Sequence, residues 1–300
     1  MGYMNTAIIL IPDFAMILLG FLLFRSGLWG RAFWEGFERL IYYVLFPALL
    51  INSLAKNRID LALAGPAMSA AVIVVLSGIV LGYLGKWLLR PDRRAFASGV
   101  QTAFRFNSYI GLAVAGRLYG EPGLAAFGIL IGVTVPICNI ASVWALARHA
   151  ESSFWKELAK NPLFIATIAG VSWSFTGLGV PDAIDITLAR MGGASLAGGL
   201  LAVGAALTLE SAGRHAPIVS WFLSVKMVAA PVIAFFVART LGVTGIYYDV
   251  VIMFGALPTA TSAYVLAVRM GGDGKVVALL ISMSTLIGMI TLPVVLSLLR

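Results

Sequence analysis

Two apolar stretches of the chain carry polar and helix-breaking residues in their middle. The first reads FRFNSYIG over residues 104–111, and the second reads LPTATSAY over residues 257–264. Backbone that leaves helical geometry within hydrocarbon leaves N–H and C=O groups without partners, so such a break persists only where it is packed in protein or lines a water-filled cavity. Each break lies in the penultimate apolar segment of its own half of the chain. The matched pair therefore predicts a transport site.

The residues at the two breaks are of types that favour an anion. A half-helix that begins at Asn107 or Ser108, and another that begins near Thr261 or Ser262, would each direct free N–H groups and a positive dipole end at the break. Such helix ends attract anions. Asn, Ser and Thr are also the preferred N-cap residues. Capping alone and capping combined with substrate contact are therefore both open interpretations.

Two basic residues lie deep in apolar segments. A central Arg such as Arg105 costs about 3 kcal/mol or more in a membrane. It either contacts an anion or pairs with backbone carbonyls that the break frees. Lys226 poses the same question, although its long stem can snorkel. The acids Asp13, Glu210 and Asp249 lie near segment ends, so we find no convincing deep carboxylate for proton or sodium coupling.

The composition indicates an all-α membrane protein. The 300 residues are 60% hydrophobic and 11% charged, against about 25% charged in soluble domains. The apolar segments lack the alternation of barrel strands, and a spanning helix needs about 20 apolar residues. We predict ten transmembrane helices, the first of them a retained helix and not a signal peptide. Their approximate bounds are 5–24, 37–55, 61–89, 93–119, 122–147, 158–177, 183–209, 216–241, 246–270 and 274–299.

Basic residues predict the orientation. Thirteen Lys and Arg fall on the expected cytoplasmic side and six on the outer side, so both termini are expected outside the cytoplasm. The net charge of +8 is then an orientation signal, and we expect no nucleic-acid partner. A single cysteine, Cys138, excludes an intrachain disulfide and a thiolate metal site. With two histidines and no paired aspartates at depth, the sequence predicts no metal, no cofactor and no enzyme activity.

The ten segments divide into two halves of five. Residues 1–147 form the first expected repeat, 148–157 a cytoplasmic linker, and 158–300 the second repeat. An odd number of spans per half inverts the second repeat, and such transporters bind substrate near the midplane where interrupted helices meet. Broken helices 4 and 9 are expected to cross there.

Other polar or small residues have structural interpretations. The glycines and alanines of residues 192–204 suit close helix packing or a dimer contact. Asn52 and Asn139 are expected to form interhelical hydrogen bonds, with pocket lining as the alternative.

The chain is similar to the auxin efflux carrier family, which includes plant auxin carriers and many bacterial permeases. The resemblance covers nearly the whole chain, and its motifs are RFNSYIG from Arg105, VTVPICN from Val133, and PTATSAY from Pro258 followed by GGD at 271–273. It implies a scaffold of helices 1, 2, 6 and 7, through which a homodimer is expected, and a mobile transport domain of helices 3–5 and 8–10. It also implies organic anion substrates such as auxin, malate or malonate.

The resemblance also implies the substrate-binding residues. These are Arg105, Asn107, Ser108, Tyr109, Pro258, Thr259, Thr261, Ser262 and Tyr264, with Asn52, Asn139 and Lys226 as further candidates. Relatives typically carry Asn where this chain has Ser262, which offers only a hydroxyl in place of an amide.

These observations predict a secondary transporter of a small carboxylate with an elevator-type mechanism, in the cell membrane and, for a bacterial protein, the inner membrane. The alternatives are a sodium-coupled organic anion symporter, by analogy with the similar bile acid:sodium symporters, and a channel. Proton or sodium coupling stays open, and lipid is the surrounding partner.

Overall fold

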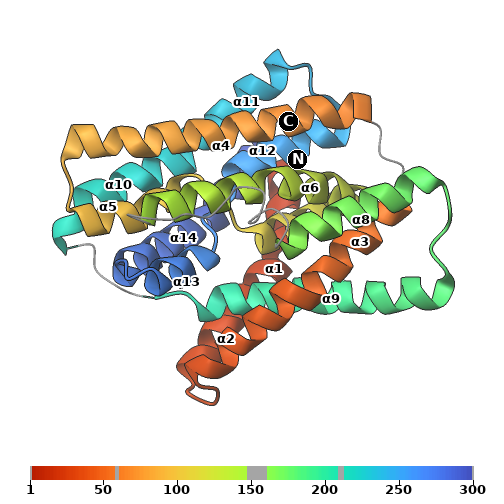
Figure 1. The fold of residues 1–300 in the computed structure, drawn as a ribbon, viewed down its shortest axis with the longest axis horizontal. Coiled ribbons are helices and arrows are strands. Elements are labelled where there is room, and N and C mark those ends of the chain that lie inside the picture. The colour runs from red at the N-terminus through yellow and green to blue at the C-terminus, as the bar shows by residue number, and fades with distance from the viewer. Residues whose placement is uncertain (1, 58–60, 147–160, 209–212, 299–300) are drawn as a thin grey trace.

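A computed structural model describes residues 2–57, 61–146, 161–208 and 213–298 (Figure 1). Every regular element in these ranges is a helix, as the composition predicts. Six of the described helices are long and apolar enough to cross a membrane. They span Arg31–Lys56, Ala62–Leu89, Arg93–Leu146, Asp182–Ala205, Ala216–Thr240 and Gly274–Ser297, while Pro162–Thr176 and Gly245–Ala256 are shorter apolar helices.

The first half of the chain contains helices α1 to α6. Their bounds are α1 Gly2–Arg25, α2 Arg31–Leu40, η1 Ile41–Leu45, α3 Phe46–Lys56, α4 Leu61–Leu89, α5 Arg93–Gly99, η2 Val100–Ala103 and α6 Ser108–Leu146. The second half contains α8 Pro162–Thr176, α9 Asp182–Ala205, η3 Gly213–His215, α10 Ala216–Ser224, η4 Val225–Ala229, α11 Ala230–Thr240, α12 Gly245–Ala256, α13 Ser262–Arg269 and α14 Gly274–Leu298.

Two proline residues account for irregular turns within long helices. A proline ring clashes with the carbonyl four residues earlier and lacks an N–H to bond it. Pro47 and Pro231 follow the π-helical turns η1 and η4, which contain the affected carbonyls of Tyr43 and Met227. The wider turn accommodates the ring, so α2 continues through η1 into α3 and α10 continues through η4 into α11.

Helix α6 is divided at Gly120. This residue has φ 61° and ψ −144°, a conformation that glycine adopts without a side-chain clash. The 39 residues of α6 would span about 58 Å as one straight helix, nearly twice the thickness of a hydrocarbon core. The division falls between the predicted segments 93–119 and 122–147. In contrast, the predicted start of the second segment at residue 37 is late, because the helix already begins at Arg31.

The helices pack in two groups with α6 between them (Figure 1). The α9 group comprises α1, α2, α3, α8 and α9, in which α9 lies against α1 and α3, and α3 lies along α8. The α4 group comprises α4, α5 and α10 to α14, in which α11 packs on α12 and α4. Helix α6 contacts members of both groups, and α1 also touches α14.

Glycines allow the closest approach within the α9 group. A Cβ on Gly204 would collide with the carbonyl oxygen of Ile17 in α1, and one on Gly20 would collide with the Leu201 backbone in α9. Gly192 and Gly199 similarly face Leu49 and Tyr109 of the same chain. The small-residue surface predicted at residues 192–204 therefore packs extensively against the chain's own helices.

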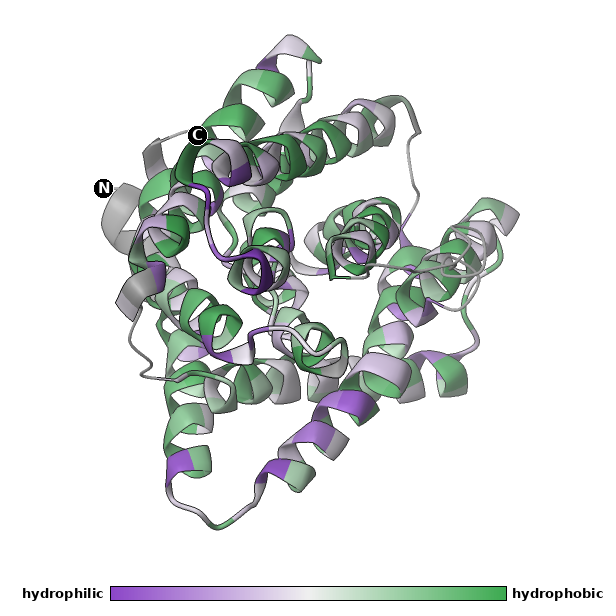
Figure 2. Ribbon diagram, turned by 60° about the vertical axis from the view of Figure 1, so that its left-hand side comes forward, coloured by the Kyte–Doolittle hydropathy of each residue, from purple (hydrophilic) through white to green (hydrophobic). Residues whose placement is uncertain are grey.

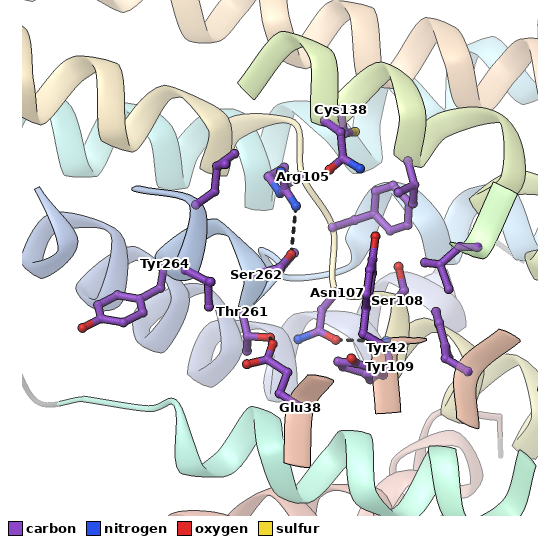
Figure 3. A pocket seen from close by; sticks show the side chains of 18 of the residues that line it. Glu38, Tyr42, Arg105, Asn107, Ser108, Tyr109, Cys138, Thr261, Ser262 and Tyr264 are labelled. Atoms are coloured by element: carbon purple, nitrogen blue, oxygen red, sulfur yellow. Dashed lines mark hydrogen bonds between the residues drawn. The ribbon is translucent and has the colours of Figure 1, made fainter. Parts of the chain in front are cut away.

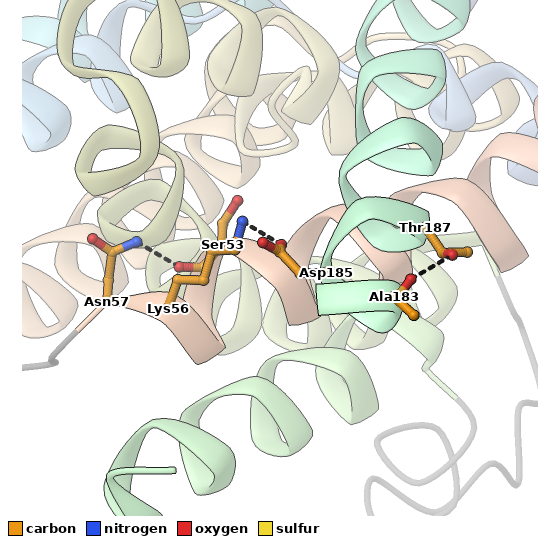
Figure 4. Close-up of polar contacts among 6 residues, drawn as sticks. All are labelled: Ser53, Lys56, Asn57, Ala183, Asp185 and Thr187. Carbon is orange, nitrogen blue, oxygen red and sulfur yellow. Dashed lines mark hydrogen bonds and ion pairs between the residues drawn. The ribbon is translucent and has the colours of Figure 1, made fainter. Parts of the chain in front are cut away.

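The outer faces of the bundle are apolar, and polar residues gather at helix ends and inside (Figure 2). On α4, Leu76, Val80 and Trp87 are exposed, as expected for side chains in contact with lipid. At one end of the α9 group, Lys56 pairs with Asp185, and Asn57 donates to the Ser53 carbonyl over 2.7 Å (Figure 4). The ion pair ties the end of α3 to the start of α9.

Candidate functional site

Helical structure is interrupted at residues 104–107 and 257–261, the two stretches that the sequence singled out. The interrupted backbones meet. The Asn107 N–H donates to the Pro258 carbonyl over 2.8 Å, and the Thr259 hydroxyl donates to the Thr102 carbonyl over 2.7 Å. The Thr259 N–H donates to the Ser284 hydroxyl of α14 over 3.2 Å. These bonds supply partners for backbone groups that would otherwise be unpaired in the interior.

Asn107 caps the longer helix that follows the first interruption. Its Oδ1 accepts the N–H groups of Tyr109 and Ile110 at 3.1 and 3.2 Å. The residue is 1% exposed, and its Nδ2 is a buried donor without a partner in the described part of the chain. Figure 3 shows this nitrogen on the side of Thr261 and the capping oxygen on the side of α6. One amide thus stabilises the helix start and leaves a donor available.

A cavity of about 450 Å³ lies beside the interruptions (Figure 3). Segments far apart in the sequence form its walls. The lining includes Glu35, Glu38, Arg39, Tyr42, Tyr43 and Phe46 from α2 to α3, residues 105–109, Val135, Cys138 and Asn139 of α6, and Ala260, Thr261, Ser262 and Tyr264.

Arg105 is 8% exposed and lies on the cavity wall. Its Nη1 donates to Ser142 Oγ over 3.2 Å, and its Nη2 donates to Ser262 Oγ over 2.9 Å. No carboxylate of the described residues lies within 4 Å of the guanidinium. Its hydrogen-bond partners are neutral hydroxyls and not the backbone carbonyls that one interpretation of the sequence proposed. The positive charge is therefore uncompensated by any neighbouring acid in these ranges.

Glu38 of α2 faces the same cavity. Thr261, at the start of α13, donates its hydroxyl to Glu38 Oε1 over 3.2 Å. Further along the contact between α2 and α13, Arg31 Nη1 donates to the Tyr264 hydroxyl over 3.0 Å, and the Arg31 guanidinium lies 5.9 Å from the Tyr264 ring centre. The two helix groups thus meet through polar side chains at the cavity.

Comparison with known proteins identifies the family. A sequence model described as membrane transport protein matches residues 144–296, half of the chain. The chain belongs to this family of membrane transport proteins, the auxin efflux carrier family. The family that the sequence resembles is thereby confirmed. This family and the apolar helices together indicate a multi-pass membrane protein.

Several relatives of this transport protein align over most of their length. An "Uncharacterized transporter" of Methanothermobacter thermautotrophicus is 24% identical, covering 98% of each chain. The "Uncharacterized transporter YfdV" of Escherichia coli K12 is 22% identical over 87% of each chain. A "Putative malonate transporter" of Rhizobium meliloti is 21% identical over 97% of this chain and 95% of its own. These names describe transporters and not enzymes.

The structure brings together most of the predicted site residues of the transport protein. Those on the cavity wall are Arg105, Asn107, Ser108, Tyr109, Asn139, Thr261, Ser262 and Tyr264. Pro258 and Thr259 are outside the lining and join the two interruptions by hydrogen bonds. Asn52 in α3 and Lys226 in η4 are also outside the lining, at 2% and 3% exposed.

Sequence reasoning missed Glu38. The predicted second segment begins at residue 37, which puts Glu38 at its edge, whereas the helix begins at Arg31. One signal was available, because Glu35, Glu38 and Tyr42 have the i, i+3, i+7 spacing of one helical face. Within the described ranges, no group of three His, Cys, Asp or Glu side chains is arranged to hold a metal ion.

Proposed function

We propose that this protein is a secondary transporter that carries a small organic anion, a carboxylate, bound in the cavity at the two helix interruptions. The observation that carries the proposal is the Arg105 guanidinium, which is buried on the cavity wall and donates only to the hydroxyls of Ser142 and Ser262 among the described residues. Burying a cation without a counter-charge is costly. An anionic substrate would supply that charge.

The helix starts at the cavity support the same assignment. Helix α6 begins at Ser108 and α13 begins at Ser262, and both residues line the cavity. The positive dipole end at a helix start favours an anion, even where N–H groups such as those of Tyr109 and Ile110 are already capped. The Nδ2 of Asn107, which has no partner among the residues that the structure describes, adds a neutral donor. The relative named "Putative malonate transporter" makes malonate a sensible first probe.

The proposed topology has ten spans in two inverted halves. The turn at Gly120 divides α6 into two spans. Helix α5 and the first part of α6 form one interrupted span, and α12 and α13 form another. The π-helical turns join α2 to α3 and α10 to α11, so each of these pairs is also one span. Inverted-repeat transporters bind substrate where interrupted helices meet near the midplane. In this proposal both termini lie outside the cytoplasm, as the distribution of Lys and Arg favours.

Uptake measurements test the transport proposal. Wild-type protein in liposomes should take up labelled malonate with saturable kinetics, and Asn107→Ala should reduce uptake. The matched control is Asn57→Ala, because Asn57 bonds the Ser53 carbonyl away from the cavity lining. Equal saturable uptake by wild type and Asn107→Ala would show that the substrate does not bind at the helix interruptions. If wild type takes up no small carboxylate at all, the transport proposal is refuted.

We further propose an elevator motion in which the α4 group moves against the α9 group. The contact between Arg31 and Tyr264 would have to open in such a motion. A bis-maleimide that links Arg31→Cys to Tyr264→Cys in a Cys138→Ser background should therefore stop uptake. The control links Lys56→Cys to Asp185→Cys, which lie within the α9 group and should leave uptake intact. Normal uptake by the first linked protein would exclude this motion.

A further inference from the structure

The cavity contains opposite charges that do not pair with each other. Arg105 donates to the hydroxyl of Ser262, and Glu38 accepts the hydroxyl of Thr261, the preceding residue. Among the described residues, neither charged group has a partner of opposite charge within 4 Å. The neighbouring hydroxyls of Ser262 and Thr261 thus form hydrogen bonds with the Arg105 guanidinium and the Glu38 carboxyl group, and both charged residues line the same cavity.

The two charges also approach the start of α13 from different elements. Arg105 belongs to the interruption before α6, whereas Glu38 belongs to α2 of the other helix group. Figure 3 shows Arg105 beside Ser262 and Glu38 beside Thr261, on opposite sides of the start of α13, with the Asn107 amide nitrogen directed to the space near Thr261. Arg105 therefore stands at one side of the start of α13 and Glu38 at the other, with the Asn107 amide nitrogen on the side of Thr261. Glu35 and Arg39, the other charged residues of α2 in the lining, carry opposite charges, so the net charge on the α2 wall is that of one carboxylate.

Such a cavity distinguishes carboxylates by their second end. A substrate with a carboxylate at each end would place its second negative charge towards Glu38, and like charges repel strongly where water is excluded. A substrate whose second end donates a hydrogen bond would instead give Glu38 a partner. A charge-assisted hydrogen bond of this kind is about twice as strong as one between neutral groups.

We infer that the substrate of this cavity is a bipolar carboxylate, with its carboxylate bound by Arg105 and a hydrogen-donating group, most favourably an ammonium, bound by Glu38. The inference rests on the proposed transport of a carboxylate and names the class of that substrate. The aromatic pair Phe46 and Tyr109, with ring centres 5.2 Å apart, lines the wall that would contact the apolar middle of such a molecule.

Three series of ligands with equal chain lengths test the inference at neutral pH. The first series is β-alanine, γ-aminobutyrate and δ-aminovalerate, the second is malonate, succinate and glutarate, and the third is propionate, butyrate and valerate. Titration calorimetry on the purified full-length protein in nanodiscs gives each affinity. At the chain length that fits best, we expect the amino acid to bind wild type about tenfold or more tightly than the diacid, with the monoacid between them.

The Glu38→Gln variant provides the decisive comparison, with Glu121→Gln as the matched control at an exposed acid outside the cavity lining. Removing the charge should weaken amino acid binding and strengthen diacid binding, each by about tenfold, and leave monoacid binding nearly unchanged. The control should bind all three series as wild type does.

The outcomes separate this inference from the transport proposal. The bipolar inference alone is overturned if wild type binds the amino acid, the diacid and the monoacid of equal chain length with the same affinity. It is also overturned if Glu38→Gln leaves the order of these affinities unchanged. If folded wild-type protein binds none of the nine ligands, both proposals fail. The affinities of the wild-type protein decide the inference even if the Glu38→Gln variant does not fold.

Discussion

Replacing Arg105 by Gln separates a substrate contact from a structural role. Glutamine removes the positive charge and keeps an amide that can still bond one of the two serine hydroxyls that Arg105 contacts. A carboxylate 4 Å from the guanidinium gains about 4 kcal/mol at an effective dielectric constant of 20. Desolvation offsets part of this gain. We expect a net loss of about 2 to 3 kcal/mol in carboxylate binding, or an affinity that is roughly 30- to 150-fold weaker.

The stability of the ligand-free protein should change much less. A central Arg costs about 3 kcal/mol in the membrane. The hydrogen bonds from Arg105 to Ser142 and Ser262 each return about 1.5 kcal/mol, the lower value for bonds to a charged group. These contributions nearly cancel, so Arg105→Gln should shift the free energy of unfolding by at most about 1 kcal/mol.

Titration calorimetry with the best-binding carboxylate measures the affinity, and unfolding in mixed micelles measures the stability. Arg117→Gln is the control, because Arg117 is half exposed and pairs with Asp13 over 3.1 Å, outside the cavity lining. It should keep the wild-type affinity, although it leaves the buried Asp13 carboxylate without its partner and therefore costs stability. A stability loss above about 2 kcal/mol for Arg105→Gln with unchanged affinity would refute the substrate contact and support a structural Arg.

Two further substitutions test the site and the fold. Asn107→Asp keeps an oxygen to cap α6 but buries a negative charge in place of the amide donor, so we expect lower thermal stability and about tenfold or weaker carboxylate binding by calorimetry. Equal affinity would limit Asn107 to capping. Gly204→Ala should lower stability by about 1 to 3 kcal/mol because its Cβ meets the Ile17 carbonyl. Gly193→Ala, which faces open space, should not, and equal melting temperatures for the two variants would contradict the packing of α1 on α9.

Local sequence patterns were enough to predict the class of the fold and the position of the interruptions. Long apolar segments with few charges can be stable only as helices in a membrane. Proline and capping residues act over a few positions, so the break at Pro258 and the helix start after Asn107 follow from local chemistry. The turn at Gly120, two residues before Pro122, was predictable for the same reason.

Tertiary structure decided which side chains share the cavity. Helical spacing places Glu35 and Glu38 of α2 and Tyr42 of η1 on one face, but only the packing of α2 beside α13 directs that face at Thr261. Likewise, the depth of Lys226 in its segment did not reveal that it would lie outside the lining while Arg105 lies within it. Local patterns fix a residue's place along its helix, whereas its neighbours across the bundle depend on how separate helices rotate and pack against one another.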